Sequence, residues 1–374
     1  MAGIYIHIPF CKSRCIYCGF YSTTLLNLRN EYINAVCQEM ELRKDYIREP
    51  FSTIYLGGGT PSLLDESDLK MLFNYINKVY NVDENAEITI ECNPDDVTPE
   101  FASMLGRLSV NRVSMGAQTF SDNRLKLLHR RHNSSEVSRA VKLLREAGIR
   151  NISIDLMFGF PDESLSQWQE DISAALALNV EHISAYSLMY EDGTPLWKML
   201  ENNKVKEIDE ELSLAMFKEL VGRLTNAGYE HYEISNFARP GFRSRHNSSY
   251  WHQVPYIGLG AAAHSFDLKS RQWNVTDLKR YIEDINNGIV PMEREELDSN
   301  TTFNDIITTA LRTSDGIDLK MTETKLGVQY KNTLIACAKK HIDKGLLKIS
   351  EGRLKLTDKG IFISDMIMSD LMIV

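Results

Sequence analysis

The chain has little of what a membrane-spanning or disulfide-stabilised protein needs. No run of apolar residues approaches the roughly 20 that a helix requires to cross a bilayer. Only 6 of the 374 residues are cysteine, too few for a disulfide scaffold in a chain of this length. The first residues, 1–10, alternate in hydropathy and lack the basic segment of a signal peptide. We therefore expect a cytoplasmic protein with no transmembrane segment.

An excess of positive charge is also missing. The sequence holds 42 lysines and arginines against 51 aspartates and glutamates, which gives a formal net charge of −9. Such a surface repels phosphate backbones, so we expect no general nucleic-acid binding. Hydrophobic residues make up 43% of the chain, enough to fill a substantial core.

The first half of the chain alternates between strand-like and helix-like segments. Six apolar, β-branched runs are each followed by a loop and a helix-period segment: Ile4–Ile8, Thr53–Leu56, Glu87–Glu91, Arg112–Met115, Ile152–Met157 and His182–Ser187. Strict alternation predicts an α/β fold with a parallel sheet and right-handed crossovers. Six units are too few for a complete eight-unit barrel, so we predict an open, partial (β/α)6 barrel.

The pattern changes after residue 190 and indicates two further segments. Residues 1–235 form the predicted barrel core, and residues 236–298 are expected to be a loop-rich segment with aromatics and histidines. Residues 299–374 are mostly helical and end in a predicted hairpin across Glu351-Gly352, an arrangement that resembles a winged-helix module. This last segment has 11 basic and 9 acidic residues. Because that excess is small, we expect it to pack or to contact a partner, not to bind DNA.

Three cysteines lie within eight residues of one another. Cys11, Cys15 and Cys18 occupy the loop directly after the first strand, and ligands of such sheets gather at the carboxyl ends of the strands. Three thiolates cannot fill four tetrahedral positions, so any metal centre that they hold keeps one site open. An iron–sulfur cluster with one open iron fits this set. A zinc site completed by a distant histidine, or three unrelated thiols, are the alternatives.

Other strand ends supply polar residues that face the same edge of the sheet. The second strand ends in Gly57-Gly58-Gly59-Thr60-Pro61, and the third ends at Glu91. Gln118 and Arg130 follow the fourth, and Asp155 is a charge inside the apolar fifth strand. Any one of these polar groups has an ordinary structural explanation. Together with the cysteines they predict one pocket.

The spacing Cys-x3-Cys-x2-Cys after a first strand resembles the hallmark of radical S-adenosylmethionine proteins. The resemblance implies that Cys11, Cys15 and Cys18 hold a [4Fe-4S] cluster, whose open iron binds the amino and carboxylate groups of S-adenosylmethionine. In that family, reductive cleavage of this ligand yields a radical that abstracts hydrogen from a substrate. An electron donor of unknown identity is implied as a partner.

Four stretches are similar to the branch that contains oxygen-independent coproporphyrinogen III dehydrogenase (HemN) and the haem chaperone HemW. They are residues 5–11, 57–61, 116–120 and 155–161. The resemblance implies that nine residues contact S-adenosylmethionine: Tyr5, Tyr17, Gly58, Gly59, Thr60, Glu91, Gln118, Arg130 and Asp155. In this assignment Asp155 holds ribose hydroxyls and Arg130 faces a carboxylate.

Two departures from the dehydrogenase pattern and one further motif favour the chaperone side. Phe20 stands where the dehydrogenase has a fourth cysteine, and the dehydrogenase has an extension before the strand that here contains Tyr5. The motif at His246, Tyr250 and Trp251 resembles the His-Asn-x-x-Tyr-Trp signature associated with haem binding. Neutral imidazole is a good axial ligand for haem iron, and aromatic rings offer flat apolar surface.

The residues alone leave the role of this motif open. His252 and His264 are alternative haem ligands. In the alternative, purely structural interpretation, His246 forms a hydrogen bond with a loop, and Tyr250 and Trp251 are aromatic residues of the hydrophobic core.

The expected function is haem delivery to acceptor proteins such as respiratory enzymes, with any membrane association peripheral and through those acceptors. The alternative is an enzyme of porphyrin biosynthesis, an oxygen-independent coproporphyrinogen III oxidase that decarboxylates propionates. A zinc-bound regulator is disfavoured by the acidic balance of the chain.

Overall fold

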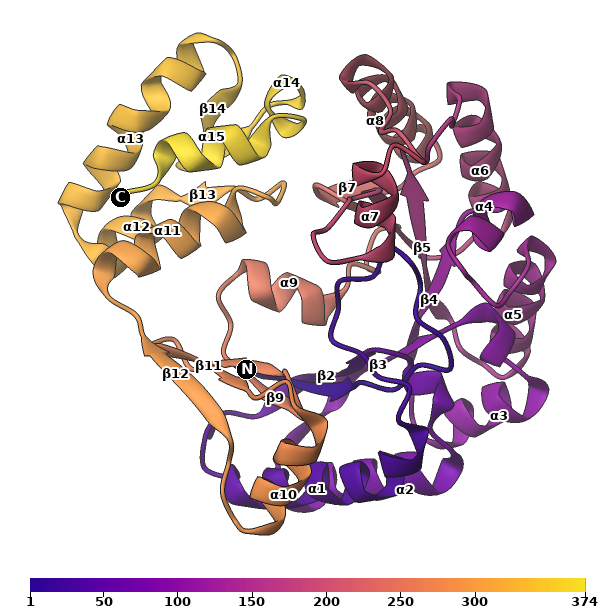
Figure 1. The fold of residues 1–374 in the computed structure, drawn as a ribbon. Coiled ribbons are helices and arrows are strands. Elements are labelled where there is room, and N and C mark those ends of the chain that lie inside the picture. The colour runs from indigo at the N-terminus through magenta and orange to yellow at the C-terminus, as the bar shows by residue number, and fades with distance from the viewer. Residues whose placement is uncertain (374) are drawn as a thin grey trace.

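One continuous sheet of twelve strands organises this computed structural model, which describes residues 1–373 (Figure 1). The strand order is β12-β11-β10-β9-β1-β2-β3-β4-β5-β6-β8-β7. The bounds are Ala2–Ile8 (β1), Phe51–Gly58 (β2), Val82–Cys92 (β3), Arg112–Gln118 (β4), Asn151–Phe158 (β5), His182–Ser187 (β6), Glu230–Glu233 (β7), Asn236–Ala238 (β8), Tyr256–Leu259 (β9), His264–Phe266 (β10), Ser270–Asn274 (β11) and Met292–Glu296 (β12). Strands β1 to β6 pair in parallel, which confirms the predicted partial barrel.

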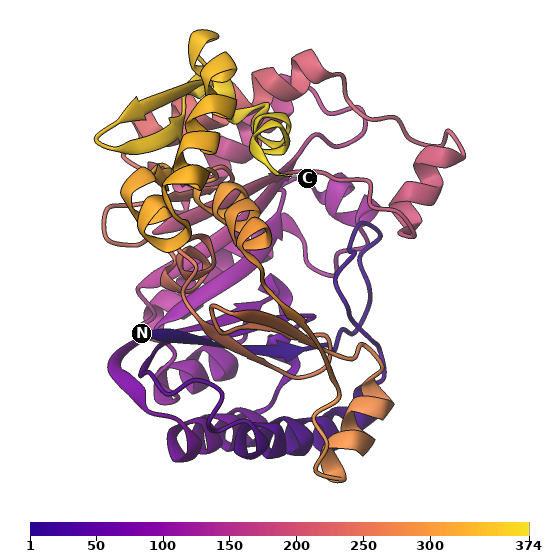
Figure 2. The same cartoon turned by 90° about the vertical axis from the view of Figure 1, so that its left-hand side faces the viewer.

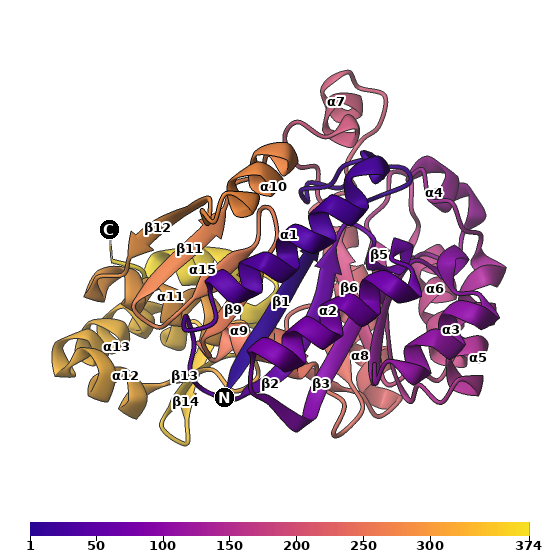
Figure 3. The same ribbon diagram turned by 90° about the horizontal axis from the view of Figure 1, so that it is seen from below.

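Helices cover the outer face of the parallel strands, as Figure 3 shows for α1 and α2. The bounds are Arg29–Leu42 (α1), Glu66–Val79 (α2), Pro99–Arg107 (α3), Asp122–Leu127 (α4), Ser134–Glu146 (α5), Leu165–Ala177 (α6), Pro195–Glu201 (α7) and Glu210–Asn226 (α8). Their starts follow local rules: the Thr98 hydroxyl accepts from Phe101 N, and Pro99 needs no partner at the first helical position. Within residues 1–373, no helix is both long and apolar enough to span a membrane.

The last segment forms a small module with a hydrophobic core of its own. Its elements are α11 (Ser299–Ala310), β13 (Ile317–Asp318), α12 (Leu319–Leu326), α13 (Val328–Asp343), β14 (Leu347–Ser350), β15 (Arg353–Leu356), α14 (Asp358–Ile361) and α15 (Ser364–Leu371). The predicted hairpin is β14–β15, and its two turn residues have positive φ, 54° at Glu351 and 73° at Gly352. Figures 1 and 2 show this winged-helix-like module (orange to yellow) beside the sheet, where α11 contacts α9 (Arg245–Trp251).

Residues 236–298, expected to be rich in loops, contribute more regular structure than predicted. They hold β8 to β12 together with α9 and α10 (Leu278–Asn286). β9 pairs in parallel with β1 and extends the sheet beyond the barrel, and β10 to β12 follow as antiparallel strands. These strands are three to five residues long and partly polar, so they carry little periodic signal. The division of the chain at residues 235 and 298 remains a prediction.

A buried ion pair on α1 fastens these added strands to the barrel. Arg43 Nη1 lies 3.0 Å from Glu39 Oε1, and the two side chains are 6% and 0% exposed. Arg43 also donates to the carbonyl of Gly258 on β9, at 2.8 Å. Glu39 accepts from Asn274 Nδ2 on β11 and from the hydroxyl of Tyr281 on α10. This Glu39–Arg43 network therefore holds β9, β11 and α10 against α1.

Candidate functional site: two adjoining cavities

A cavity at the carboxyl ends of the parallel strands contains the predicted cluster residues, and we call it the cluster cavity. The three thiols and all of the predicted S-adenosylmethionine residues except Tyr5 line it: Cys11, Cys15, Cys18, Tyr17, Gly58, Gly59, Thr60, Glu91, Gln118, Arg130 and Asp155. They come from β2 to β5, from the cysteine loop (residues 11–18) and from the segment after α4. The structure brings these segments together around one cavity.

Apolar packing fixes the cysteine loop in place. Ile16, between the second and third cysteines, is buried in a small cluster with Leu128 and Leu196, among others. Its backbone N–H donates to Leu128 O at 3.3 Å, and its carbonyl accepts from Leu196 N at 3.0 Å. In Figure 3 this indigo loop lies beside α7, which carries Leu196. The loop is thus held by the chain's own contacts on two sides.

Polar side chains of the cavity contact two of the three thiols. Arg130 Nη1 lies 3.6 Å from Cys15 Sγ, and the Thr60 hydroxyl donates to Cys11 Sγ at 3.4 Å. Burial raises the pKa of Cys11 and of Cys18, while the charge of Arg14 acts in the opposite direction. In the part of the chain that the structure describes, no three His, Cys, Asp or Glu side chains are close enough to hold one ion. A four-iron cluster binds each thiolate at a different iron and so takes more widely spaced ligands.

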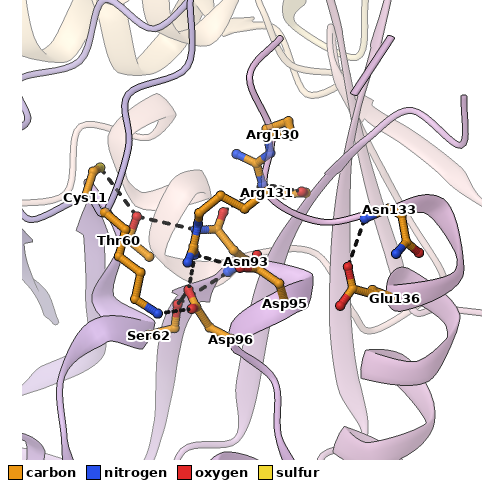
Figure 4. Close-up of polar contacts among 12 residues, drawn as sticks. Cys11, Thr60, Ser62, Asn93, Asp95, Asp96, Arg130, Arg131, Asn133 and Glu136 are labelled. Atoms are coloured by element: carbon orange, nitrogen blue, oxygen red, sulfur yellow. Dashed lines mark hydrogen bonds and ion pairs between the residues drawn. The ribbon is translucent and has the colours of Figure 1, made fainter. Parts of the chain in front are cut away.

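A polar network at the rim connects the loops around this cavity (Figure 4). Asp96 accepts from Ser62 Oγ at 2.9 Å and from Arg131 Nη2 at 2.9 Å. Lys12, inside the cysteine loop, lies 3.3 Å from the same carboxylate. One aspartate therefore connects the cysteine loop, the segment after β2 and the segment after α4.

Acidic and basic side chains line this cavity together: Glu91, Asp95 and Asp155 with Arg14, Arg130 and Arg131. Glu91 accepts hydrogen bonds from the Tyr55 hydroxyl at 2.7 Å and from Gly58 N at 3.1 Å. Burial raises the pKa of Glu91 to about 7, and the charge of Asp155 adds to this effect. Burial also raises the pKa of Asp155. Acidic and basic groups in one pocket can match the ammonium and carboxylate of an amino acid group.

Gly59 has a structural reason to lack a side chain. A Cβ atom there would lie 2.8 Å from the carbonyl oxygens of Ile8 and Phe10. Only glycine lets the end of β2 pack directly against the start of the cysteine loop. This contact places Thr60 within reach of Cys11.

Two residues of this region are missing from the sequence-based set. Asn93 directly follows β3, and its Oδ1 accepts from Arg130 Nη2 at 2.7 Å. It sits at a strand end, the same signal that identified Glu91. Arg112 is 1% exposed. It lies on β4, and its charge acts to lower the pKa of Glu91 and of Asp155.

A second cavity, of about 680 Å³, adjoins the first, and we call it the aromatic cavity. Its lining includes Tyr5, Phe20, Tyr21, Tyr250, Trp251, Tyr256 and Phe266, with His7, His264 and Arg271. Strands β1 and β9 to β11, helices α9 and α11 and the segment after Cys18 contribute these residues. Phe20 is 72% exposed and lines both cavities. The volume lies within the range of ordinary small-molecule sites.

Tyr5 lines the aromatic cavity and not the cluster cavity. It lies midway along β1, below the strand end, and its hydroxyl is hydrogen-bonded to His7 Nδ1 at 3.0 Å. The contact between Tyr5 and S-adenosylmethionine stays a prediction, and the position of Tyr5 below the strand end does not favour it.

The three residues of the predicted haem motif separate into two groups. Tyr250 and Trp251 line the aromatic cavity, whereas His246 is 1% exposed and lies behind it. His246 Nδ1 is 2.8 Å from Thr53 Oγ1, and Nε2 is 2.8 Å from the Tyr250 hydroxyl. Burial lowers the pKa of His246 to about 3, so this imidazole is neutral. Both of its ring nitrogens are occupied by protein partners.

The two alternative haem ligands, His252 and His264, differ in their location. His252 is exposed, and its nitrogens lie near Ser248 O and Asp315 Oδ2. His264 lines the aromatic cavity.

Comparison with known proteins identifies both parts of the chain. Residues 5–175 match the radical SAM superfamily, and residues 297–363 match the HemN C-terminal domain. The haem chaperone HemW of Bacillus subtilis is 35% identical over 364 residues, 96% of this chain and 96% of the relative. That of Lactococcus lactis is 31% identical over 361 residues, 95% of this chain and 93% of the relative.

A solved structure shares the fold. Coproporphyrinogen III oxidase (HemN) of Escherichia coli superimposes with a TM-score of 0.86 at 21% identity, over 99% of this chain and 89% of that one. The sequence relatives show that the chain belongs to the radical SAM superfamily and, within it, to the HemW family.

Proposed function

We propose that this chain is a haem chaperone that binds a [4Fe-4S] cluster, S-adenosylmethionine and haem, and that hands haem to acceptor proteins. The observation that carries the proposal is the aromatic cavity beside the cluster cavity, with Phe20 lining both. A porphyrin is a flat apolar ring with charged propionates, and it needs aromatic surface together with a few polar groups. Its HemW relatives are named haem chaperones.

In this proposal the cluster cavity binds the cluster and S-adenosylmethionine, which together supply one-electron chemistry. Cys11, Cys15 and Cys18 are the iron ligands. Glu91 and Asp155 offer carboxylates to the ammonium and the ribose hydroxyls.

The affinity for S-adenosylmethionine is expected to fall at acidic pH. The pKa of Glu91 in the free protein is raised to about 7 by burial, so the group is increasingly protonated below that pH. An ammonium ligand requires the carboxylate, and binding must then release a proton. Between pH 8 and pH 6 we expect the dissociation constant to rise about tenfold. Anaerobic calorimetric titration of the cluster-reconstituted protein measures it.

Glu91→Gln is the control for this pH dependence. It should bind more weakly at pH 8 but show almost no change between pH 8 and pH 6, because the amide does not titrate in this range. An equal pH slope in the variant and the wild type would contradict the assignment.

Anaerobic titration of the cluster-reconstituted protein with haem tests the proposed function. Saturable, roughly one-to-one binding in the visible spectrum, followed by transfer of haem to an apo-haem protein, is the expected result. Absence of saturable binding would refute it. Conversion of coproporphyrinogen III to a product lighter by two carboxyl groups, measured by mass, would instead support the oxidase alternative.

A further inference from the structure

His264 differs from its neighbours in having a free imidazole at the aromatic cavity. It lies on β10, where Ser265 is buried on one face and His264 and Phe266 point to the other. Its side chain is exposed, and its ring stacks on Trp273 at a centroid distance of 6.0 Å. Within residues 1–373 neither of its ring nitrogens has a hydrogen-bond partner. This imidazole is oriented by stacking while its lone pair stays available.

The other histidines of this region are already occupied. His7 also lines the cavity, but its nitrogens lie 3.0 Å from the Tyr5 hydroxyl and 3.0 Å from Tyr21 O. His246 is enclosed between Thr53 and Tyr250. To bind iron through one ring nitrogen, either histidine would have to give up the hydrogen bond at that nitrogen in a buried setting, which is costly.

Arg271 places a positive charge on the same wall. Its position on β11 is opposite Phe266, and its side chain lines the cavity. Its Nη1 lies 3.4 Å from Asp305 Oδ1 and its Nε lies 3.5 Å from Glu295 Oε2, so both ion pairs are loose. A ligand carboxylate can therefore compete for this guanidinium with better geometry.

The state of His264 agrees with a ligand role. Partial desolvation by the cavity wall, together with the charge of Arg271, lowers the pKa of His264 and so favours the neutral imidazole. Neutral imidazole is the form that binds haem iron.

Resting on the proposed function, we infer that His264 is the axial ligand of haem in the aromatic cavity and that Arg271 pairs with a haem propionate. His246 then has a positioning role: its hydrogen bond holds Tyr250 against the cavity. Asp305, Thr308 and Thr309 on α11 of the C-terminal module line the same cavity. Haem would thus lie between the β9–β11 extension and this module.

The test compares four full-length, cluster-reconstituted proteins titrated anaerobically with haem: wild type, His264→Ala, His252→Ala and His246→Ala. We expect His264→Ala to lose the spectrum of imidazole-ligated haem and to bind at least about tenfold more weakly. Added imidazole should restore the spectrum in this variant, a rescue that a merely misfolded protein would not show. The exposed control, His252→Ala, should match the wild type.

A second pair of measurements tests the propionate contact. Arg271→Ala should weaken the binding of haem about tenfold but leave the binding of haem dimethyl ester unchanged, because the ester carries no carboxylates. Equal losses for both ligands would overturn the role of Arg271.

The outcomes separate this inference from the proposed function. If the wild type does not bind haem, the proposed function fails, and with it this inference. If the wild type binds and His264→Ala keeps its spectrum and affinity, the inference alone is wrong. Loss of imidazole ligation in His246→Ala, restored by added imidazole, would then assign the ligand to the His-Asn-x-x-Tyr-Trp motif.

Discussion

Replacing Cys15 with alanine is expected to abolish the cluster. Each thiolate of a three-cysteine site binds a different iron, and the loss of one leaves two irons without a protein ligand. Cys15 is also the thiol nearest Arg130, at 3.6 Å, so its removal leaves that guanidinium without its sulfur partner. After anaerobic reconstitution, iron and sulfide should fall from about four of each per chain to near zero. The brown absorption and the electron-spin signal of the reduced cluster should disappear with them.

Cys337→Ala is the matched control. Cys337 lies on α13 in the C-terminal module and is only partly buried. The variant removes the same chemical group, a thiol, at a site far along the chain from the cysteine loop. Its cluster content should equal that of the wild type. An intact cluster in Cys15→Ala would refute the ligand assignment, and stoichiometric zinc without iron in the wild type would favour the zinc alternative.

The barrel could be predicted because its signals are local. β-branched runs such as Ile152–Met157 alternate with capped helices, and the pattern of each strand–helix unit is contained within about 30 residues. The added strands have no such signal. The sequence of β12, Met292–Glu296, is Met-Glu-Arg-Glu-Glu, and all five residues are exposed. They become strands because β11 offers a free edge, a tertiary effect that no local pattern reports.

The residues of the candidate site likewise divide into those that the sequence could predict and those that depend on tertiary contacts. Cys11, Glu91 and Asp155 could be predicted because strand ends of a parallel sheet must meet at one edge. The sequence could not predict which histidine has a ring nitrogen free to bind a ligand. His246 is enclosed by Thr53, a partner 193 residues away in the chain, and only the fold brings them together. Motif and spacing thus located the region of the aromatic cavity, and the hydrogen bonds decide which of its imidazoles is free.

Arg43→Ala is expected to lower the free energy of unfolding by about 3–5 kcal/mol. The variant leaves the Glu39 carboxylate, 0% exposed, without its ion partner, and a buried charge alone is costly. It also removes the donor to Gly258 O on β9. Guanidinium unfolding followed by circular dichroism measures the change.

Lys70→Ala is the control for Arg43→Ala, because the Lys70–Glu66 pair has the same i,i+4 spacing on a neighbouring helix but is 57% and 38% exposed. Its loss should cost no more than about 0.5 kcal/mol.

The double variant Glu39→Gln/Arg43→Ala should lose less stability than Arg43→Ala alone, since no charge is left buried without a partner. Equal losses for Arg43→Ala and Lys70→Ala would contradict the account. Because β9 to β11 carry Tyr256, His264 and Arg271, a weakened attachment of these strands should also reduce haem affinity. Cluster content should be retained, because Cys11, Cys15 and Cys18 line the other cavity.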